Sequence, residues 1–302
     1  MNRTNFILRW LSTNGKEAMS KIISTQTTDH PIPDALTYIP DLAYDSVDGT
    51  PLGADVYRPK DTSAGPLPIV VFVHGGGLFC SSRKANREYA ELLAERGYVV
   101  FVPSYRLIDE ADGPHSIADV CTGLTYLKDH ASEFGGDLSR VFVNGESAGA
   151  FLSLYAVALT NSDQLRETFG IDAPELDIRG FASFGGMLYT AEFDMIGLVY
   201  RRSLYGDRLG DESFMELINP EDPRIERRLP PVLQVSSSED FLKKYRLRYN
   251  KALTYTGHEH RLIYFQHGKE LAHAFPSLQP QRPQSKVVLD ELDLWIRELL
   301  DR

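Results

Sequence analysis

The feature that most constrains this 302-residue chain is the segment Gly145-Glu146-Ser147-Ala148-Gly149. The apolar run 141–143 precedes it and the helix-forming stretch 150–159 follows it. Strand, sharp turn and helix in this order are the context of a nucleophile elbow, which places a serine at the apex of a strained turn. Glycines two residues to either side occupy positions where a Cβ would clash. We therefore predict that Ser147 is a nucleophile, presented where free helical N–H groups favour negative charge.

Apolar runs of strand length alternate with helix-forming stretches along most of the chain. This alternation predicts an α/β fold with a mostly parallel sheet covered on both faces, whose ligands bind at the carboxyl ends of the strands. With 42% apolar residues, the chain can build a large core. The expected strands are 52–57, 69–73, 98–102, 141–143, 178–184, 232–235 and 262–265, and the expected helices are 83–96, 117–127, 150–159, 243–256 and 285–300.

The acidic balance of the chain limits its partners. Lysine plus arginine number 32 and aspartate plus glutamate 42, so the net charge is −10, which argues against nucleic acid or an anionic membrane as the main partner. No apolar stretch is long enough to span a membrane, and residues 1–21 do not read as a secretory signal. The two cysteines, Cys80 and Cys121, are expected to be buried thiols in a reducing compartment. These features predict a cytoplasmic protein.

A glycine-rich loop follows the strand expected at 69–73. Consecutive glycines in His74-Gly75-Gly76-Gly77 leave backbone N–H groups uncovered and able to point at a ligand. We expect Gly75 and Gly76 to form an oxyanion hole together with Ala148, the residue after the nucleophile. His74 is expected to brace this loop rather than to react.

A serine nucleophile needs a base, and the base needs a carboxylate that orients it. In α/β-hydrolases the order along the chain is serine, acid, histidine. The loop after strand 232–235 offers Asp240 as the acid, with Glu239 as the alternative because the loop register is unknown. His273, after strand 262–265, is the expected base. The histidines expected to be solvated loop residues are His258, His260 and His267.

Together these motifs resemble the hormone-sensitive lipase branch of the α/β-hydrolases, the bacterial esterases with a His-Gly-Gly-Gly loop. The resemblance runs from about Ala43 to the C-terminus. It departs from the branch at Glu146, where Asp or Thr is common, and at Ile108-Asp109-Glu110, where Ala-Pro-Glu is usual. The motifs that carry it are His74–Gly77, Tyr105-Arg106-Leu107, Gly145–Gly149, Asp240 with Phe241-Leu242, and His273-Ala274-Phe275.

The resemblance implies an α/β-hydrolase core with an eight-stranded sheet and a helical cap. The core would comprise residues 46–186 and 230–302, and the cap residues 1–45 and 187–229, which would line the acyl and alcohol pockets. Glu146 would be buried and hydrogen-bonded near the elbow. No metal or organic cofactor is implied, and the final helix and last strand are candidate homodimer surfaces.

These expectations converge on a serine carboxylesterase that acts on short-chain or aryl esters. The alternatives are an acetyl or feruloyl esterase acting on esterified sugars, an amidase that uses the same residues, a lipase acting at a lipid surface, and a non-catalytic receptor. Aromatic side chains in 187–229 would either stack on an aromatic acyl group or form the core of the cap, and we favour the core. These side chains are Tyr189, Phe193, Tyr200 and Tyr205.

Overall fold

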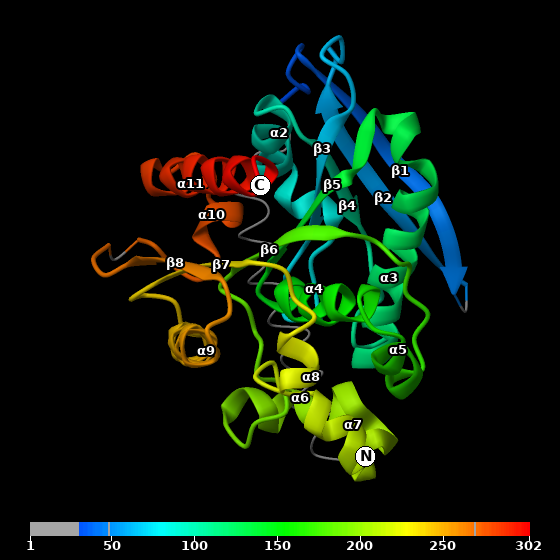
Figure 1. Cartoon of the computed structure of the whole chain (residues 1–302), viewed down its shortest axis with the longest axis vertical. Coiled ribbons are helices and arrows are strands. Elements are labelled where there is room, and N and C mark those ends of the chain that lie inside the picture. The colour runs from blue at the N-terminus through cyan, green and yellow to red at the C-terminus, as the bar shows by residue number, and fades with distance from the viewer. Residues whose placement is uncertain (1–29, 48, 269) are drawn as a thin grey trace.

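A computed structural model describes residues 30–47, 49–268 and 270–302 of the chain. In these residues eight strands form one sheet in the order β1-β2-β4-β3-β5-β6-β7-β8 (Figure 1). Strand β2 pairs antiparallel with β1 and β4, and every other pair is parallel. The strands are β1 Leu36–Val47, β2 Thr50–Pro59, β3 Leu67–Val73, β4 Val99–Pro103, β5 Gly136–Glu146, β6 Ile178–Phe184, β7 Val232–Ser237 and β8 His260–Phe265. The predicted eight-stranded, mostly parallel sheet is confirmed.

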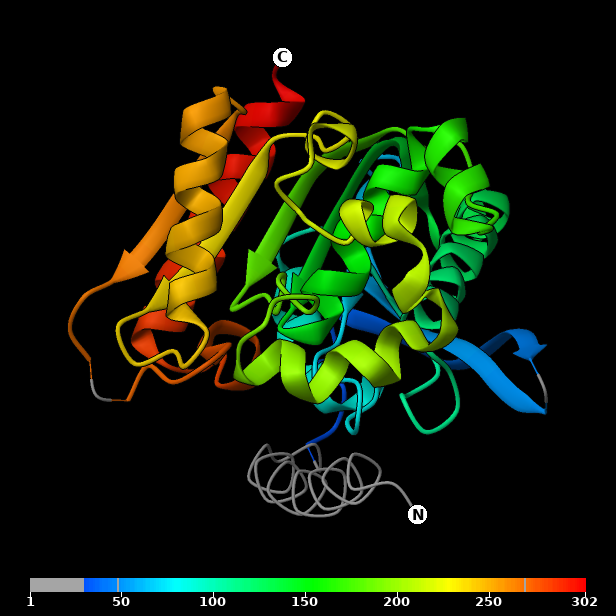
Figure 2. The ribbon, with the colours of Figure 1, turned by 90° about the horizontal axis from the view of Figure 1, so that it is seen from below.

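Helices cover both faces of the sheet, as the buried apolar strands require. One core cluster packs α3, α4 and α9 against one face, and a second packs α2, α10 and α11 against the other (Figures 1 and 2). The helices are η1 Arg83–Asn86, α2 Arg87–Glu95, α3 Gly113–His130, η2 Ala131–Phe134, α4 Ala148–Thr160, α5 Asp163–Phe169, α6 Met195–Tyr205, η3 Gly206–Gly210, α7 Glu212–Leu217, α8 Pro223–Glu226, α9 Lys243–Thr256, α10 Phe275–Leu278 and α11 Pro283–Leu300.

Most of strand β1 lies in the segment 1–45, for which the sequence predicts a cap. It pairs with β2 along its length, with register shifts between Ile39 and Leu42 and between Ala43 and Asp45. Such bulges interrupt the alternation of side chains by which a strand is recognised in a sequence. Residues 36–45 therefore belong to the sheet, which corrects the expected boundary. Residues 1–29 of this expected cap segment lie outside the described residues.

Residues 187–229 contain α6, η3, α7 and α8, and they join β6 to β7. Tyr189, Tyr200 and Tyr205 are buried in the core, whereas Phe193 is 82% exposed. Most of the aromatic side chains of this insertion thus pack into its core. Helix α6 runs past the edge of the sheet at which β5, β6 and β7 end (Figure 2), so the insertion lies beside the edge where an active site is expected.

Candidate active site

Ser147 stands at the turn between β5 and α4. Its backbone has φ 51° and ψ −115°, a strained conformation for a residue with a Cβ. A Cβ at Gly145 would lie 2.6 Å from the Cα of Ala150, and one at Gly149 would lie 2.2 Å from the carbonyl oxygen of Val73. Only glycine fits at these two positions, so the turn depends on the spacing that the sequence shows.

The structure brings Ser147, His273 and Asp240 together in one hydrogen-bonded chain. The distance from His273 Nε2 to Ser147 Oγ is 2.8 Å, and that from His273 Nδ1 to Asp240 Oδ1 is 2.7 Å. The carboxylate of Glu239 is exposed and accepts a hydrogen bond from the hydroxyl of Ser238. The geometry therefore selects Asp240 over Glu239 as the partner of His273.

Asp240 is 2% exposed and surrounded by donors. Besides His273, it accepts hydrogen bonds from the N–H of Leu242 at 2.8 Å and from the hydroxyl of Ser236 at 3.0 Å. Burial by itself raises the pKa of Asp240, but the hydrogen bond and charge of His273, with the other two donors, bring this pKa below its ordinary value. An ionised Asp240 holds a proton on Nδ1 of His273 and leaves Nε2 free to accept the proton of Ser147.

The other late histidines lie away from Ser147. His260 begins β8 and His258 lies just before it, at the amino edge of the sheet, whereas Ser147 is at the carboxyl edge. His258 contacts the carbonyl of Pro230 at 3.0 Å. His267 is exposed.

The backbone N–H of Gly75 corrects one expectation. It donates to Oε1 of Glu146 at 3.1 Å, so it is engaged by a side chain instead of facing a substrate. Gly76 and Gly77 line the pocket beside Ser147, and the N–H of Ala148 belongs to the first turn of α4, where helical N–H groups lack intrahelical acceptors. This hydrogen bond argues against Gly75 as an oxyanion donor and favours Gly77, with Gly76 and Ala148, as the candidate donors.

Glu146 is 1% exposed and joins three segments of the site. Its carboxylate accepts from Gly75 in the glycine loop, from the amide of Asn86 in η1 at 3.0 Å, and from the hydroxyl of Ser277 in α10. Burial raises the pKa of Glu146. Sequence reasoning anticipated a buried Glu146 but not Asn86 or Ser277, which belong to no recognisable motif.

His74 supports the glycine loop through its side chain. Its Nδ1 lies 2.9 Å from the carbonyl oxygen of Gly75, and its ring stacks on that of Tyr105 with centroids 4.4 Å apart. The hydroxyl of Tyr105 donates to the carbonyls of His74, at 2.8 Å, and Gly75, at 3.0 Å. Burial lowers the pKa of His74 to about 4, so its ring is neutral at neutral pH.

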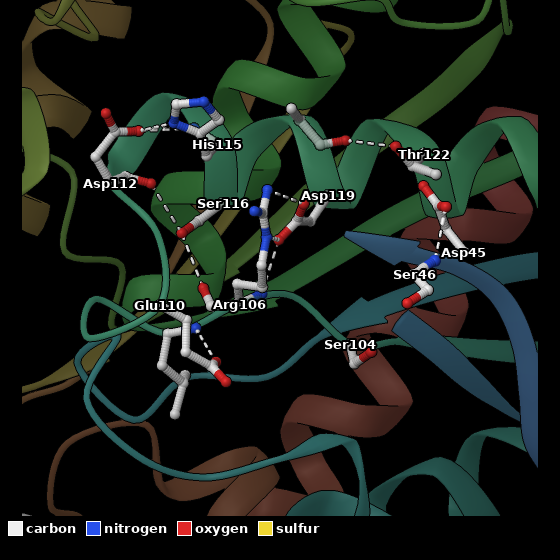
Figure 3. A network of polar contacts seen from close by, with 12 residues as sticks. Asp45, Ser46, Ser104, Arg106, Glu110, Asp112, His115, Ser116, Asp119 and Thr122 are labelled. Atoms are coloured by element: carbon white, nitrogen blue, oxygen red, sulfur yellow. Dashed lines mark hydrogen bonds and ion pairs between the residues drawn. The ribbon is translucent and has the colours of Figure 1, made fainter. Parts of the chain in front are cut away.

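A buried ion pair fixes the segment that carries Tyr105. The next residue, Arg106, donates through Nε and Nη2 to the two carboxylate oxygens of Asp119 in α3, at 2.9 and 2.8 Å, and Ser116 donates to the carbonyl of Arg106 (Figure 3). Charged bidentate pairs of this kind are among the stronger hydrogen bonds in proteins. The Tyr-Arg-Leu motif thus has a structural role: Arg106 anchors the segment from which Tyr105 supports the glycine loop.

A pocket of about 440 Å³ opens beside Ser147 and His273. Its walls are mainly apolar, with Met187, Ile196 and Leu278 among them. Among the described residues, its ionisable lining comprises Glu146, whose carboxylate is engaged as above, together with His273, Cys80 and Tyr200. This lining suits an uncharged, apolar group. Cys80 is buried, as expected, and its thiol donates to the carbonyl of Gly76 at 3.2 Å.

Esterases are among the known proteins to which this chain is similar. Residues 54–195 match the family model BD-FAE. The chain is 29% identical over 197 residues to an isoprenylcysteine alpha-carbonyl methylesterase of Arabidopsis thaliana, which covers 62% of this chain and 45% of that protein. The chain thus spans less than half the length of this curated relative.

Solved structures share the fold along nearly the whole chain. Esterase B from Lactobacillus rhamnosis superposes with a TM-score of 0.87 at 22% identity, covering 98% of this chain and 97% of that one. Brefeldin A esterase, described as a bacterial homologue of human hormone-sensitive lipase, gives a TM-score of 0.73 at 18% identity and covers 98% of this chain and 86% of its own. The predicted α/β-hydrolase fold is confirmed, and the chain resembles this member of the branch in fold.

None of the helices in the described residues has the length and apolar character needed to cross a membrane. The same residues hold no group of three or more His, Cys, Asp or Glu side chains placed to bind a metal ion.

Proposed function

We propose that this α/β-hydrolase is a serine carboxylesterase that hydrolyses short-chain or aryl carboxylic esters through an acyl-enzyme. The observation that carries the proposal is the hydrogen-bonded chain from Ser147 through His273 to Asp240, which lies at the carboxyl edge of the sheet beside an apolar pocket. A nucleophile, a base within hydrogen-bond reach and a buried orienting carboxylate are the parts that acyl transfer requires. The esterase names of the relatives support the same activity.

The proposed reaction begins when His273 Nε2 takes the proton of Ser147 and the serine oxygen attacks the ester carbonyl. Asp240 stabilises the imidazolium that forms. The N–H groups of Gly76, Gly77 and Ala148 stabilise the oxyanion, each by about 3 kcal/mol in the transition state. His273 then protonates the leaving alcohol, and a water molecule that His273 activates releases the acid.

The pocket supports small, uncharged substrates. Its volume of about 440 Å³ suits a ligand of modest size. Its apolar walls offer few polar groups to a sugar hydroxyl, which favours simple alkyl or aryl esters over esterified sugars. We propose that residues 187–229 act as the cap of this pocket, because Tyr200 of α6 lines it and donates to the carbonyl of Gly77 at 2.7 Å. The cytoplasmic location and the homodimer stay predictions.

Hydrolysis of a substrate series tests the proposal. We would measure kcat/KM for p-nitrophenyl acetate, butyrate and octanoate, for a feruloyl ester, for an acetylated sugar and for butyryl p-nitroanilide, with Ser147→Ala as the blank. We expect Ser147-dependent turnover that is highest for a short acyl or feruloyl group on an apolar alcohol. Preference for the anilide would indicate an amidase, preference for the acetylated sugar a sugar esterase, and no turnover on any of them would contradict the proposal.

A further inference from the structure

The backbone segment Phe184–Met187, here called the support segment, touches all three proposed catalytic residues. The N–H of Ser147 donates to the carbonyl of Phe184, and the N–H of Met187 donates to the carbonyl of Ser147, both at 2.9 Å. At Gly185 a Cβ would lie 2.9 Å from the ring of His273 and 3.0 Å from Oδ2 of Asp240. The positions of nucleophile, base and acid therefore all depend on where this segment lies.

One buried side chain from another element holds the support segment in place. Arg246 of α9 is 0% exposed, and its Nη2 donates to the carbonyl of Gly186 at 2.6 Å. Its Nη1 donates to the hydroxyl of Ser183, near the end of β6, at 2.9 Å. The same nitrogen donates to Oε1 of Gln234 in β7 at 3.4 Å. The guanidinium thus fastens the end of β6 to α9, the helix that begins directly after the loop of Asp240.

The guanidinium of Arg246 is a buried cation whose hydrogen-bond acceptors carry no charge. Its acceptors in the described part of the chain are a hydroxyl, an amide oxygen and a backbone carbonyl, all of them uncharged. Burying a cation without a carboxylate partner is unfavourable. Burial lowers the pKa of Arg246 to about 10, while the nearby charge of Asp240 acts in the opposite direction, so the group stays protonated at neutral pH. Tyr189 and Tyr249 are the other ionisable groups whose field reaches it.

An apolar residue in this place would avoid that unfavourable burial, so packing alone does not explain an arginine here. Two donors on one rigid plane can hold the Gly186 carbonyl and the Ser183 hydroxyl at the same time, which neither lysine nor an apolar residue can do. The carboxylate whose charge acts on the guanidinium is that of Asp240. The placement of this cation therefore points to a task at the active site.

We propose that Arg246 is a positioning residue of the active site, which fixes the support segment and through it the contacts among Ser147, His273 and Asp240. This inference rests on the function proposed above. Arg246 touches no substrate and takes no part in proton transfer. Its removal should lower the rate of the chemical step and leave substrate binding in the pocket nearly unchanged.

Arg246→Met and Arg246→Lys test the role, with Arg248→Gln as the matched control. Arg248 lies on the same helix, but its side chain is 44% exposed and pairs with Glu192 and Glu221 at the surface. For p-nitrophenyl butyrate we expect Arg246→Met to lower kcat about 10- to 100-fold, the size of effect that a displaced catalytic group produces, with KM changed less than about threefold. The Lys variant should recover part of the rate, and Arg248→Gln should match the wild type.

Proton NMR provides a readout that is independent of turnover. The Nδ1–H of His273, hydrogen-bonded to Asp240, should give a low-field resonance in the wild type and in Arg248→Gln. The proposal expects this resonance to shift or broaden in Arg246→Met. A folded Met variant with wild-type kcat and an unchanged resonance would overturn it.

A milder variant keeps the proposal testable where the Met variant does not fold. Ser183→Ala removes one acceptor of Arg246 and leaves the cation in place, and we expect kcat to fall about threefold, in line with the loss of one hydrogen bond. Wild-type kcat in Ser183→Ala would then overturn the proposal. The two claims also fail separately: a wild type that hydrolyses no ester contradicts the proposed function, while a His273 resonance that moves in the Arg246 variants still supports the positioning role.

Discussion

Gly75 donates its backbone N–H to the carboxylate of Glu146, with 3.1 Å between the nitrogen and Oε1. The contact joins the glycine loop after β3 to the residue that precedes the proposed nucleophile. The same carboxylate accepts from Asn86 and Ser277, so four segments meet at one buried group. A carboxylate with this many donors can define the relative position of the loop, the elbow and the segment after His273.

Glu146→Ala should therefore destabilise the protein and slow it. Removal of the acceptor leaves buried donors of Gly75, Asn86 and Ser277 unsatisfied, and each such group costs about 1–3 kcal/mol. We expect the free energy of unfolding, measured by urea denaturation, to fall by at least about 2 kcal/mol, and kcat to fall with it. Glu146→Gln keeps an acceptor oxygen and should lose less of both. Equal stability of the wild type and the Ala variant would show that the carboxylate does not hold these segments together.

Tyr200→Phe should lower kcat through the glycine loop. The substitution removes the hydroxyl that donates to Gly77 at 2.7 Å and leaves the ring against Phe79. Loss of one hydrogen bond of about 1 kcal/mol would lower kcat roughly fivefold, with little change in KM. Tyr205→Phe is the matched control, since Tyr205 is also buried in α6 but bonds to Thr190, away from the loop. An equal decrease in both variants would assign the effect to the stability of the insertion.

The stability of the fold should depend on pH through His74. Its pKa is lowered by burial to about 4 in the folded protein, against an ordinary value of 6.5. Between these values His74 is protonated in the unfolded chain and neutral in the folded protein. Its contribution to the free energy of unfolding is therefore fully present above pH 6.5 and is lost as the pH falls toward 4. This one group accounts for about 3 kcal/mol over that window.

Urea denaturation at several pH values between about 4.5 and about 7.5, a range that covers most of the interval between the two pKa values, measures this dependence. His74→Gln should flatten the curve, whereas a substitution of the exposed His267 should leave it as in the wild type. Retention of the full pH dependence in His74→Gln would assign it to other groups.

Asp240→Asn and Glu239→Gln should differ sharply in activity. The asparagine would hold His273 in the wrong tautomer and could not stabilise an imidazolium, so we expect kcat to fall on the order of 10³- to 10⁴-fold. The exposed Glu239 has no contact with His273, and its variant should keep the wild-type rate. The kcat of each variant on p-nitrophenyl butyrate decides the matter, and a large loss in Glu239→Gln alone would reverse the assignment.

The elements that sequence reasoning found are those with a clear pattern. Strand β6 and helix α9 have the predicted bounds, because a continuous apolar run and an uninterrupted helical stretch mark them. The serine, the acid and the histidine were within reach because each follows a recognisable strand. Strand β1 was missed because its bulges break the alternation of side chains.

The hydrogen-bond partners of individual groups could not be predicted in the same way. A glycine loop in a sequence predicts uncovered N–H groups, but it does not show that Glu146, 71 residues later, takes the N–H of Gly75. Arg246 is one of several cations in α9, and no prediction was made for it. The helical spacing from Leu242 to Tyr249 and Leu253 is the signal that could have placed it on the buried face. Contacts between segments distant in the sequence decide both cases.

Covalent trapping of the nucleophile tests the central claim most directly. We would incubate the wild type and Ser147→Ala with a p-nitrophenyl alkylphosphonate, follow p-nitrophenol release, and locate the adduct by peptide mass spectrometry. The account predicts one equivalent of p-nitrophenol, a phosphonyl group on the peptide that contains Ser147, and loss of esterase activity in proportion. No adduct in the wild type, an adduct at another residue, or ester hydrolysis that persists in Ser147→Ala would contradict it.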